Sequence, residues 1–548
     1  MVSRPAGPAA AVARRRRRAL DEPAYPVRLP MTRSEELAAP EPPDGGRRTA
    51  FLVVEQGFAA RFLLRTDVLR TLTEAGVRVV VLAPNPDEEY LVEELAAQGV
   101  ELEPLRANRQ VVQRSRWWWL VHNLRTFALG EPQRSRAFLD YYHGFRGQVA
   151  ADHPWIARCI HLALQPLWRS RRLRRALLAV EARLFTRDLH HDLFERHRPD
   201  LVVTTSPGWF LPDALVLREA RRRGVRTAAV VLAWDNPTNK GYRGADPDLT
   251  IVWSQRMAEQ IVRHHDYPRE RILVGGVPHF DPYLRADGLP SRDELFARMG
   301  LDPQRRLILF ATRSPASYPH SPVVAEALAR AVSDDALGHP AQLVVRLHPV
   351  SFRPGYDLPL DEYRRLSDRH PHVHLDVPTV VSQRLRSDMP ATETTRLGAL
   401  IKHCDVLVNV FSTTSLEAML VDRPVVMVSP DAHLSAGDGA ARGAPEWPRE
   451  FADYEHTREL VERGAARVAN SMAELVEHVA PYLDDPARDG PQRREAAARE
   501  CGPMDGRSGR RVGRYLLDAM GAAPTDGARA AQAPPEPARP RAATGSAT

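Results

Sequence analysis

The chain has 548 residues, of which 43% are hydrophobic and 26% are charged, and its formal net charge at pH 7 is +7. A chain of this length and composition predicts two domains with ordinary soluble cores rather than one. Because 76 basic side chains are nearly balanced by 69 acidic ones, the charge alone does not indicate a nucleic-acid-binding protein.

The cysteine usage and the hydropathy pattern limit where the protein is expected to work. Cys159, Cys404 and Cys501 are odd in number and far apart, which argues against a disulfide framework and against a zinc site and fits a reducing cytoplasm. No apolar run follows Arg14 to Arg18, and no stretch approaches the roughly 20 apolar residues of a membrane-spanning helix. We therefore expect a cytoplasmic protein, soluble or peripheral on the inner face of the cell membrane.

The first part of the chain reads as a basic tail followed by an α/β domain. Residues 1–48 are rich in Ala, Pro and Arg and lack periodicity, which predicts disorder. Strand and helix patterns then alternate over 49–285, which predicts an N-terminal Rossmann-like domain. Its expected strands are at 50–55, 77–83, 100–104, 201–205, 227–232, 249–253 and 271–276, with helices at 62–73, 88–97, 211–223 and up to about 265.

A helical insertion interrupts this domain from about residue 106 to 198. Trp117-Trp118-Trp119 and the stretch from Arg158 to Arg198, with ten arginines against four acidic residues, are suited to an anionic membrane surface. The alternative is that these helices cover the N-terminal sheet and expose an arginine-rich face.

A second Rossmann-like domain is predicted over 286–521, after a polar linker near 284–304. Its expected strands are at 306–311, 342–347, 372–376, 405–410 and 424–428. Residues 522–548 repeat the composition of the first tail and are predicted to be disordered. Because ligands of such sheets bind beyond the carboxyl ends of the strands, two facing domains predict a cleft between them.

Two strand ends of the second domain carry the clearest chemical signals. One strand stops at His348-Pro349, which leaves a histidine at its carboxyl edge. Another runs directly into Ser412-Thr413-Thr414-Ser415, with Glu417 in the first turn of the next helix. Hydroxyl residues at a helix start, together with its free N–H groups and its dipole, favour an anion, so a phosphate site is predicted there.

The order of the motifs resembles the GT-B glycosyltransferase superfamily over roughly residues 49–520. Within it, the chain is similar to the branch that contains CDP-glycerol glycerophosphotransferases, surface-polysaccharide glycosyltransferases and UDP-N-acetylglucosamine 2-epimerases. The motifs are Val252-Trp253, Val274-Gly275-Gly276-Val277-Pro278-His279-Phe280-Asp281, Arg346-Leu347-His348-Pro349, Ser412 to Ala418, Arg423-Pro424-Val425-Val426 and Asp505 to Val512. The epimerases usually have Gly-Gly after the phosphate serine, where this chain has Thr413-Thr414, which disfavours an epimerase.

The resemblance implies that the second domain holds the nucleotide-activated donor and that the first domain holds the acceptor, and it implies roles for the residues at both strand ends. His348 would contact the donor's pyrophosphate or assist the leaving group, Ser412 to Ser415 would bind phosphate oxygens, and Glu417 would bind the ribose. The alternatives are a histidine bonded to a loop carbonyl, plain helix capping, and a first-turn glutamate that the helix dipole favours.

Transfer also needs a base for the acceptor's proton, and the sequence leaves two candidates open. Glu55 follows the first strand beside Gly57, a residue that lets the backbone approach substrate closely. Asp235 follows a later strand of the same edge, beside Lys240, one of only two lysines in the chain and a candidate contact for acceptor or phosphate. Turn formation is the alternative for both carboxylates.

The alternating pattern predicts an α/β enzyme, and the resemblance implies that it is of GT-B type, with a nucleotide-activated donor as substrate, no cofactor and no obligatory metal. The preferred activity is transfer of a sugar or alditol phosphate to a surface-glycan or lipid-linked acceptor. The runner-up is a UDP-sugar 2-epimerase. A third hypothesis, a non-catalytic basic scaffold or nucleic-acid-binding protein, leaves the alternating α/β pattern unexplained. We expect no nucleic-acid partner.

Overall fold

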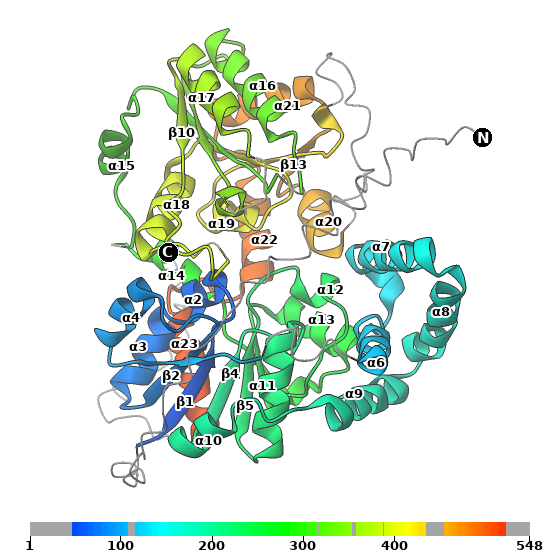
Figure 1. Cartoon of the computed structure of the whole chain (residues 1–548). Helices are drawn as coiled ribbons and strands as arrows, with labels where there is room; N and C mark the ends of the chain where they lie inside the picture. Colours follow the sequence, from blue (N-terminus) through cyan, green and yellow to red (C-terminus); the bar gives the residue numbers. More distant parts are fainter. Residues whose placement is uncertain are drawn as a thin grey trace, which may run out of the picture.

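Two parallel sheets form the body of the molecule (Figure 1). The computed structural model describes residues 47–107, 115–286, 288–315, 317–352, 358–386, 388–433 and 454–521. Apart from residues 47 and 48, the two tails that were predicted to be disordered lie outside these ranges. The predicted α/β class, with two Rossmann-like domains, is confirmed.

The first sheet has seven strands in the order β3-β2-β1-β4-β5-β6-β7. The order reverses direction between β1 and β4, which is the topological switch point beside which ligands of doubly wound sheets bind. The strands are β1 (Thr49–Val53), β2 (Arg78–Ala83), β3 (Glu101–Pro104), β4 (Leu201–Thr204), β5 (Arg226–Val230), β6 (Leu249–Val252) and β7 (Ile272–Val274).

Both faces of the first sheet are buried, and alternate residues of each strand serve different cores. Ala50 and Leu52 belong to the core under α3 (Asp67–Glu74) and α13 (Gln255–His265). Phe51 and Val53 face the opposite core with α11 (Leu211–Arg222). This alternation explains why these strands appear in the sequence as continuous apolar runs.

The second sheet has six strands in the order β10-β9-β8-β11-β12-β13. All its pairs are parallel, with Ala311 of β8 opposite both Arg346 of β9 and Asn409 of β11. The strand β13 was not predicted, because its three residues give too short a pattern. The bounds are β8 (Arg306–Ala311), β9 (Ala341–Arg346), β10 (Val373–Asp376), β11 (Val406–Asn409), β12 (Val425–Val428) and β13 (Arg467–Ala469).

The helices follow the predicted alternation with one break. The single helix expected at 62–73 is two helices, α2 (Gly57–Leu63) and α3, because the side chain of Thr66 accepts a hydrogen bond from the Val68 N–H and starts a new helix. The other helices of the two domains are α4 (Glu89–Ala96), α12 (Asn236–Asn239), α14 (Asp281–Leu284), α15 (Arg292–Met299), α16 (Ser321–Ser333), α17 (Leu360–Arg369), α18 (Ala391–His403), α19 (Thr414–Leu420), α20 (Glu455–Glu462), α21 (Met472–Asp484), α22 (Gly490–Cys501) and α23 (Ser508–Met520).

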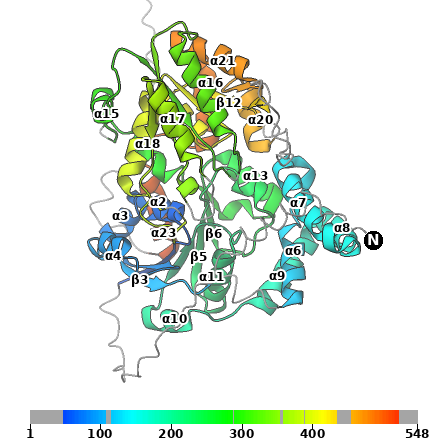
Figure 2. The same cartoon turned by 45° about the horizontal axis from the view of Figure 1, so that its top comes forward.

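The insertion is helical, as predicted, and only part of it covers the first sheet. Trp118 and Phe194 join the core on the α11 side of that sheet. The middle helices form a separate small core and project from the body (Figures 1 and 2). The helices are α6 (Arg116–Thr126), α7 (Arg136–Asp152), α8 (Pro154–Arg169), α9 (Arg171–Phe185) and α10 (His191–His197).

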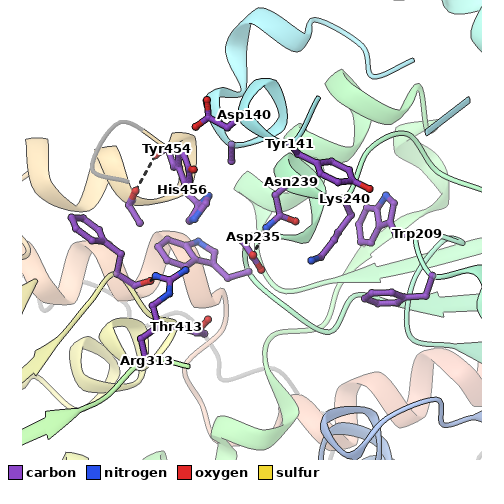
Figure 3. A pocket seen from close by; sticks show the side chains of 15 residues that line it. Asp140, Tyr141, Trp209, Asp235, Asn239, Lys240, Arg313, Thr413, Tyr454 and His456 are labelled. Carbon is purple, nitrogen blue, oxygen red and sulfur yellow. Dashed lines mark hydrogen bonds between the residues drawn. The ribbon is translucent and has the colours of Figure 1, made fainter. Parts of the chain in front are cut away.

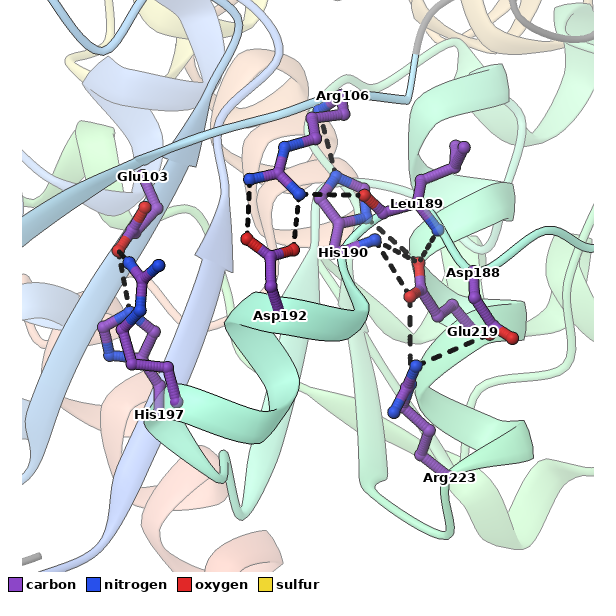
Figure 4. A network of polar contacts seen from close by, with 10 residues as sticks. Glu103, Arg106, Asp188, Leu189, His190, Asp192, His197, Glu219 and Arg223 are labelled. Atoms are coloured by element: carbon purple, nitrogen blue, oxygen red, sulfur yellow. Dashed lines mark hydrogen bonds and ion pairs between the residues drawn. The ribbon is translucent and has the colours of Figure 1, made fainter. Parts of the chain in front are cut away.

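Polar contacts fix the return of the insertion to the sheet (Figure 4). The His190 Nε2 accepts a hydrogen bond from the Arg106 N–H at 2.9 Å, so Nδ1 of the neutral ring carries the proton toward the Glu219 carboxylate at 3.0 Å. The His197 ring also lies 2.8 Å from the Glu103 carboxylate. These histidines are therefore structural.

The last helix crosses back to the first sheet. The predicted second domain ran to residue 521, but α23 packs against α3 and contacts β4 and β5. The Asp281 carboxylate accepts hydrogen bonds from the Ser508 and Gly509 N–H groups at 2.9 and 2.8 Å, which caps the start of α23. Two motifs of the family resemblance, those that contain Asp281 and Ser508, therefore meet at the connection between the sheets.

Candidate active site

A cavity of about 510 Å³ lies between the two sheets, and both domains contribute to its wall (Figure 3). The first domain and its insertion supply residues from α7, from the loop after β4 and from the loop after β5. The second domain supplies residues that follow β8 and β11 and the start of α20. The lining residues are Ala137, Asp140, Tyr141, Trp209, Phe210, Trp234, Asp235, Asn239, Lys240, Arg313, Phe411, Thr413, Tyr454, His456 and Thr457.

Two predicted residues, Asp235 and Lys240, line the first-domain side of the cavity. The Asn239 amide donates a hydrogen bond to the Asp235 carboxylate, which holds this acid at the start of α12. Lys240 ends the same short helix, and Figure 3 shows its ammonium pointing toward Asp235. The structure thus brings together a candidate base and a cation.

Arg313 is a cavity residue that the sequence analysis missed. It follows β8, the central strand of the second sheet, and donates hydrogen bonds to the carbonyl oxygens of Val410 at 2.8 Å and Phe411 at 3.0 Å. Phe411 has a φ of +46°, a left-handed conformation that costs an ordinary residue energy and is concentrated at functional sites. A basic residue at the carboxyl edge of the first strand of the second domain was the signal available in the sequence.

Arg313 faces a carboxylate across the cleft. Burial lowers the pKa of the Arg313 guanidinium, and the Asp235 charge opposes this shift. An arginine remains charged in proteins despite such a shift. The guanidinium therefore supplies positive charge beside Thr413, at the edge where a phosphate was predicted.

The start of α20 adds Tyr454 and His456, neither of which was predicted. His456 is 9% exposed, its ring packs edge-on against Trp234 at 4.9 Å, and burial lowers its pKa while Asp235 raises it. Burial and the neighbouring Asp140 charge raise the pKa of Tyr454. At neutral pH the imidazole of His456 and the phenol of Tyr454 are therefore uncharged. Asp140 belongs to the insertion, and the sequence did not reveal that the insertion contacts the cleft.

His348 lies at the predicted sheet edge but not in the cavity wall. Its backbone N–H donates to the Thr312 Oγ1 at 3.0 Å, and its Nδ1 accepts from the Val350 N–H at 3.1 Å. In the neutral ring Nε2 then carries the proton and is the nitrogen able to donate. The strands before His348 and Ser412, β9 and β11, flank β8, so both residues follow strands that end at the same edge of the sheet.

The hydroxyl cluster is only partly exposed to the cavity. Thr413 lines it. Thr414 and Ser415 instead accept hydrogen bonds from the Asn409 amide at 3.1 and 2.8 Å, which ties the start of α19 to β11. The Ser412 Oγ accepts a hydrogen bond from the Thr414 N–H at 3.4 Å, which agrees with the alternative role of plain helix capping.

Glu417 is buried one turn further along α19. The Tyr283 hydroxyl, on the segment that connects the two domains, donates a hydrogen bond to its carboxylate at 2.5 Å. Burial raises the pKa of Glu417. The structure does not bring this residue to the cavity wall, and its predicted contact with a ribose stays a prediction.

Glu55 and Gly57 lie under a segment of the other domain. The Glu55 carboxylate is 3.3 Å from the Arg386 guanidinium, and the Gly57 N–H donates to the Leu385 carbonyl at 2.6 Å. A Cβ at residue 57 would lie 2.5 Å from the Asp388 Cα. The close approach that Gly57 permits is therefore to the chain's own backbone.

Among the described residues, no group of three or more His, Cys, Asp or Glu side chains is arranged to hold a metal ion. Within the same ranges, every helix is too short or too polar to cross a membrane.

Comparison with known proteins supports the fold. No protein-family model matches the chain, and no curated protein matches its sequence. A putative UDP-N-acetylglucosamine 2-epimerase from Listeria monocytogenes is 12% identical, with a TM-score of 0.50 over 88% of this chain and 98% of that one. UDP-GlcNAc 2-epimerase from Neisseria meningitidis bound to UDP-GlcNAc is 11% identical, with a TM-score of 0.48 over 86% of this chain and 100% of that one. A glycosyltransferase from Rickettsia africae is 11% identical, with a TM-score of 0.44 over 87% of this chain and 98% of that one. The two parallel sheets, together with the likeness to the Listeria structure, confirm the predicted GT-B fold with two Rossmann-like domains.

Proposed function

We propose that the chain is a nucleotide-sugar-dependent enzyme of GT-B type that uses the cavity between its domains as the active site. The observation that carries this proposal is the placement of Arg313 and Lys240 in one cavity at the facing edges of two doubly wound sheets. Such edges are where nucleotides bind in these folds, and two cations there favour a diphosphate.

The preferred activity is transfer of a sugar, or of an alditol phosphate, from a nucleotide donor to a surface-glycan or lipid-linked acceptor. Arg313 and Thr413 would hold the donor's phosphates, with His348 and Ser412 at the same edge. Positive charge there stabilises the nucleotide as it leaves. Because Arg313 and Lys240 supply this charge, the reaction is proposed to need no metal and to survive EDTA.

Asp235 is the better placed of the two candidate bases, because it lines the cavity whereas Glu55 is paired with Arg386. In sugar transfer, the acceptor oxygen forms a bond to the sugar's anomeric carbon, the bond to the nucleoside diphosphate breaks, and the Asp235 carboxylate takes the acceptor's proton. General bases of this kind contribute roughly 10²- to 10⁴-fold to a rate.

A 2-epimerase is the second candidate. It is favoured by the likeness to the putative 2-epimerase from Listeria monocytogenes, which has a TM-score of 0.50. It is disfavoured by Thr413-Thr414 at the position where the resemblance implies two glycines. An epimerase needs the donor pocket but no acceptor.

Incubation with UDP-N-acetylglucosamine alone separates these activities. We expect slow release of UDP, with water in place of the acceptor, and no C2 epimer in the proton NMR spectrum. Formation of the epimer without an acceptor would replace the transferase by the isomerase.

The insertion is proposed to dock on an anionic membrane. Of the large apolar side chains in the described ranges, the four most exposed are Trp117, Trp155, Leu162 and Leu184, at 71, 68, 60 and 63%, and all lie on α6, α8 and α9. Trp155 and Leu162 are seven residues apart and therefore share a helix face, with exposed arginines nearby on α8 and α9. Apolar and basic side chains together suit anionic lipid.

Flotation with vesicles tests this docking. We expect the protein to float with phosphatidylglycerol vesicles, less so at high salt, and we expect W155S/L162S to lose most of this binding. The control V92S removes an exposed apolar side chain from α4. Equal flotation of W155S/L162S and V92S, or no flotation of the wild type, would rule out the docking.

A further inference from the structure

The indole of Trp234 is held by a side chain from the other domain. Trp234 follows β5 of the first sheet and directly precedes Asp235, the proposed base, and both residues line the cavity. The Trp234 Nε1–H donates a hydrogen bond to the Glu500 carboxylate at 2.7 Å. Both side chains are buried, so water does not compete for this bond. The loop that carries Asp235 is therefore attached to α22.

The helix α22 also contacts the element that begins at the proposed phosphate site. It lies between the two domains (Figure 1), where it packs against α19 of the second domain and α13 of the first. Just beyond Glu500 the chain turns at Gly502, whose φ is +76°, and a Cβ there would lie 2.1 Å from the Trp253 carbonyl oxygen. The end of α22 is therefore fixed against the first domain, while its body follows the second.

Local chemistry disfavours a carboxylate at residue 500. Glu500 stands in the last turn of α22, where the negative end of the helix dipole repels an anion. Burial raises the pKa of its carboxyl, although the Arg256 Nε lies 3.0 Å from its Oε1. Apolar side chains of similar volume can often replace a buried ion pair without loss of stability. Residues that break such local preferences are typical of functional sites.

The Trp234 indole depends on Glu500 more than Arg256 does. Arg256 also forms an ion pair with Glu459, and it donates a hydrogen bond to the Glu455 carbonyl oxygen at 2.8 Å. An indole has one N–H, which can only donate, and that of Trp234 is used on Glu500. The carboxylate therefore fixes the orientation of the ring next to Asp235.

We propose that Glu500 is a positioning residue, which holds the Trp234 indole and thereby sets the place of Asp235 relative to the start of α19. This inference rests on the proposed function, in which Asp235 is the base and Thr413, at the start of α19, contacts the donor's phosphates. The base has to lie within hydrogen-bond reach of the acceptor while the acceptor faces the donor. Because the base and the phosphate contacts belong to different domains, their spacing needs a link of this kind.

Three variants of the full chain test this role. W234F removes the indole N–H and keeps an aromatic ring, E500M removes the acceptor and keeps a side chain of similar length, and E500Q keeps an acceptor without the charge. The measured rate is the release of nucleoside diphosphate from the UDP- or CDP-linked donor that the wild type turns over fastest. We expect W234F and E500M to lower kcat about 10-fold, within the roughly 10²-fold effect of a misplaced group.

The KM and the conservative variant separate positioning from binding. The KM for the donor should change by less than about twofold in W234F and E500M, because Arg313 and Thr413 stay in place. E500Q should retain kcat within about threefold of the wild type, since its amide oxygen accepts the same hydrogen bond. W234F and E500Q keep the test open if E500M does not fold.

A control variant and a double variant separate positioning from stability. W168F removes an indole N–H that donates to the Phe127 carbonyl at 2.7 Å within the insertion, so it loses a comparable bond but should keep kcat within about twofold. The double variant W234F/E500M should lose no more activity than W234F alone, because both changes break one bond. Losses of kcat that multiply, or that match the loss in W168F, would overturn the inference.

NMR detects the bond without turnover. The Nε1–H signal of Trp234, identified by its absence from W234F, should move in E500M and move far less in E500Q. A signal at the same position in E500M and the wild type would overturn the inference, whatever the rates. A wild type that turns over no donor would instead overturn the proposed function, and the indole signal would still decide whether Glu500 holds the ring.

Discussion

Arg313 carries the charge on which the proposed donor site depends. Its guanidinium is held by the Val410 and Phe411 carbonyl groups at the start of the hydroxyl loop, so its orientation is set before a ligand arrives. Such preorganisation reduces the entropy that binding costs.

Replacement of Arg313 tests this assignment. R313Q should weaken the binding of a nucleoside diphosphate by about 1.5–3 kcal/mol, or roughly 10- to 100-fold, the value of hydrogen bonds to a charged group. R330Q, which changes an exposed arginine of α16, is the control. Calorimetric affinities of R313Q and R330Q that agree within twofold would contradict the role of Arg313.

The buried Glu417 carboxyl makes the stability of the folded protein depend on pH. Burial raises its pKa above the ordinary value of 4.5, so the folded state binds this proton more tightly than the unfolded chain does. The stability that the protonated carboxyl contributes is present below its unfolded pKa and is lost as the pH rises through the folded pKa.

The variant E417Q keeps a partner for Tyr283 but does not ionise. The melting temperature of E417Q relative to the wild type should therefore rise when the pH increases from about 5 to about 8. A difference that stays constant over this range would show that Glu417 does not titrate as its burial implies.

At the residue scale, sequence reasoning found the site residues that follow strands with a recognisable turn. Asp235, Lys240 and Thr413 line the cavity as expected of residues beyond strand ends. His456 was missed because it stands at a helix start far along the chain, and Tyr141 because the insertion gave no sign of which helix reaches the cleft. Such contacts depend on how the domains pack, which local pattern does not encode.

Residues 382–386 and 388–389 form a contact between the domains whose close approach depends on one glycine. They lie against the start of α2, and Asp388 receives hydrogen bonds from Arg65 and Tyr90 at 2.8 Å. The Arg65 and Asp388 side chains are 5 and 1% exposed, and a buried ion pair of this kind loses about 3–5 kcal/mol when one partner is removed. This contact therefore fastens the second domain to the first.

The variant G57A should disrupt this contact. Its Cβ would meet backbone atoms of Asp388, so the two segments must separate, at a cost of about 1–3 kcal/mol. G144A is the matched control, because its Cβ meets nothing within 4 Å on α7 and should stabilise the helix by about 0.5–1 kcal/mol. If thermal unfolding shows that the melting temperatures of G57A and G144A are lowered equally relative to the wild type, this explanation of Gly57 is contradicted.

At the element scale, the sequence predicted most strands because strands buried on both faces are apolar throughout. It did not predict β13, nor that α23 would leave the second sheet for the first. The amphipathic pattern of α23 indicates a buried face but not which sheet covers it. The capping of α23 by Asp281 is a contact between residues more than two hundred positions apart, which one sequence does not reveal.

At the scale of the whole molecule, the two sheets present their strand ends to a shared cavity, and the insertion closes one side of it. The two-domain fold could be predicted from the order of the motifs. The position of the cavity could not, because its wall combines α7, the loops that follow β4, β5, β8 and β11, and the start of α20, which are six separate parts of the chain.

A crystal structure of the full chain with the nucleotide sugar that binds most tightly would test the central claim directly. We predict that the diphosphate lies between Arg313 and Thr413 and that the sugar lies in the cavity between the domains. A diphosphate bound elsewhere, with the Arg313 guanidinium out of reach, would contradict the proposed active site.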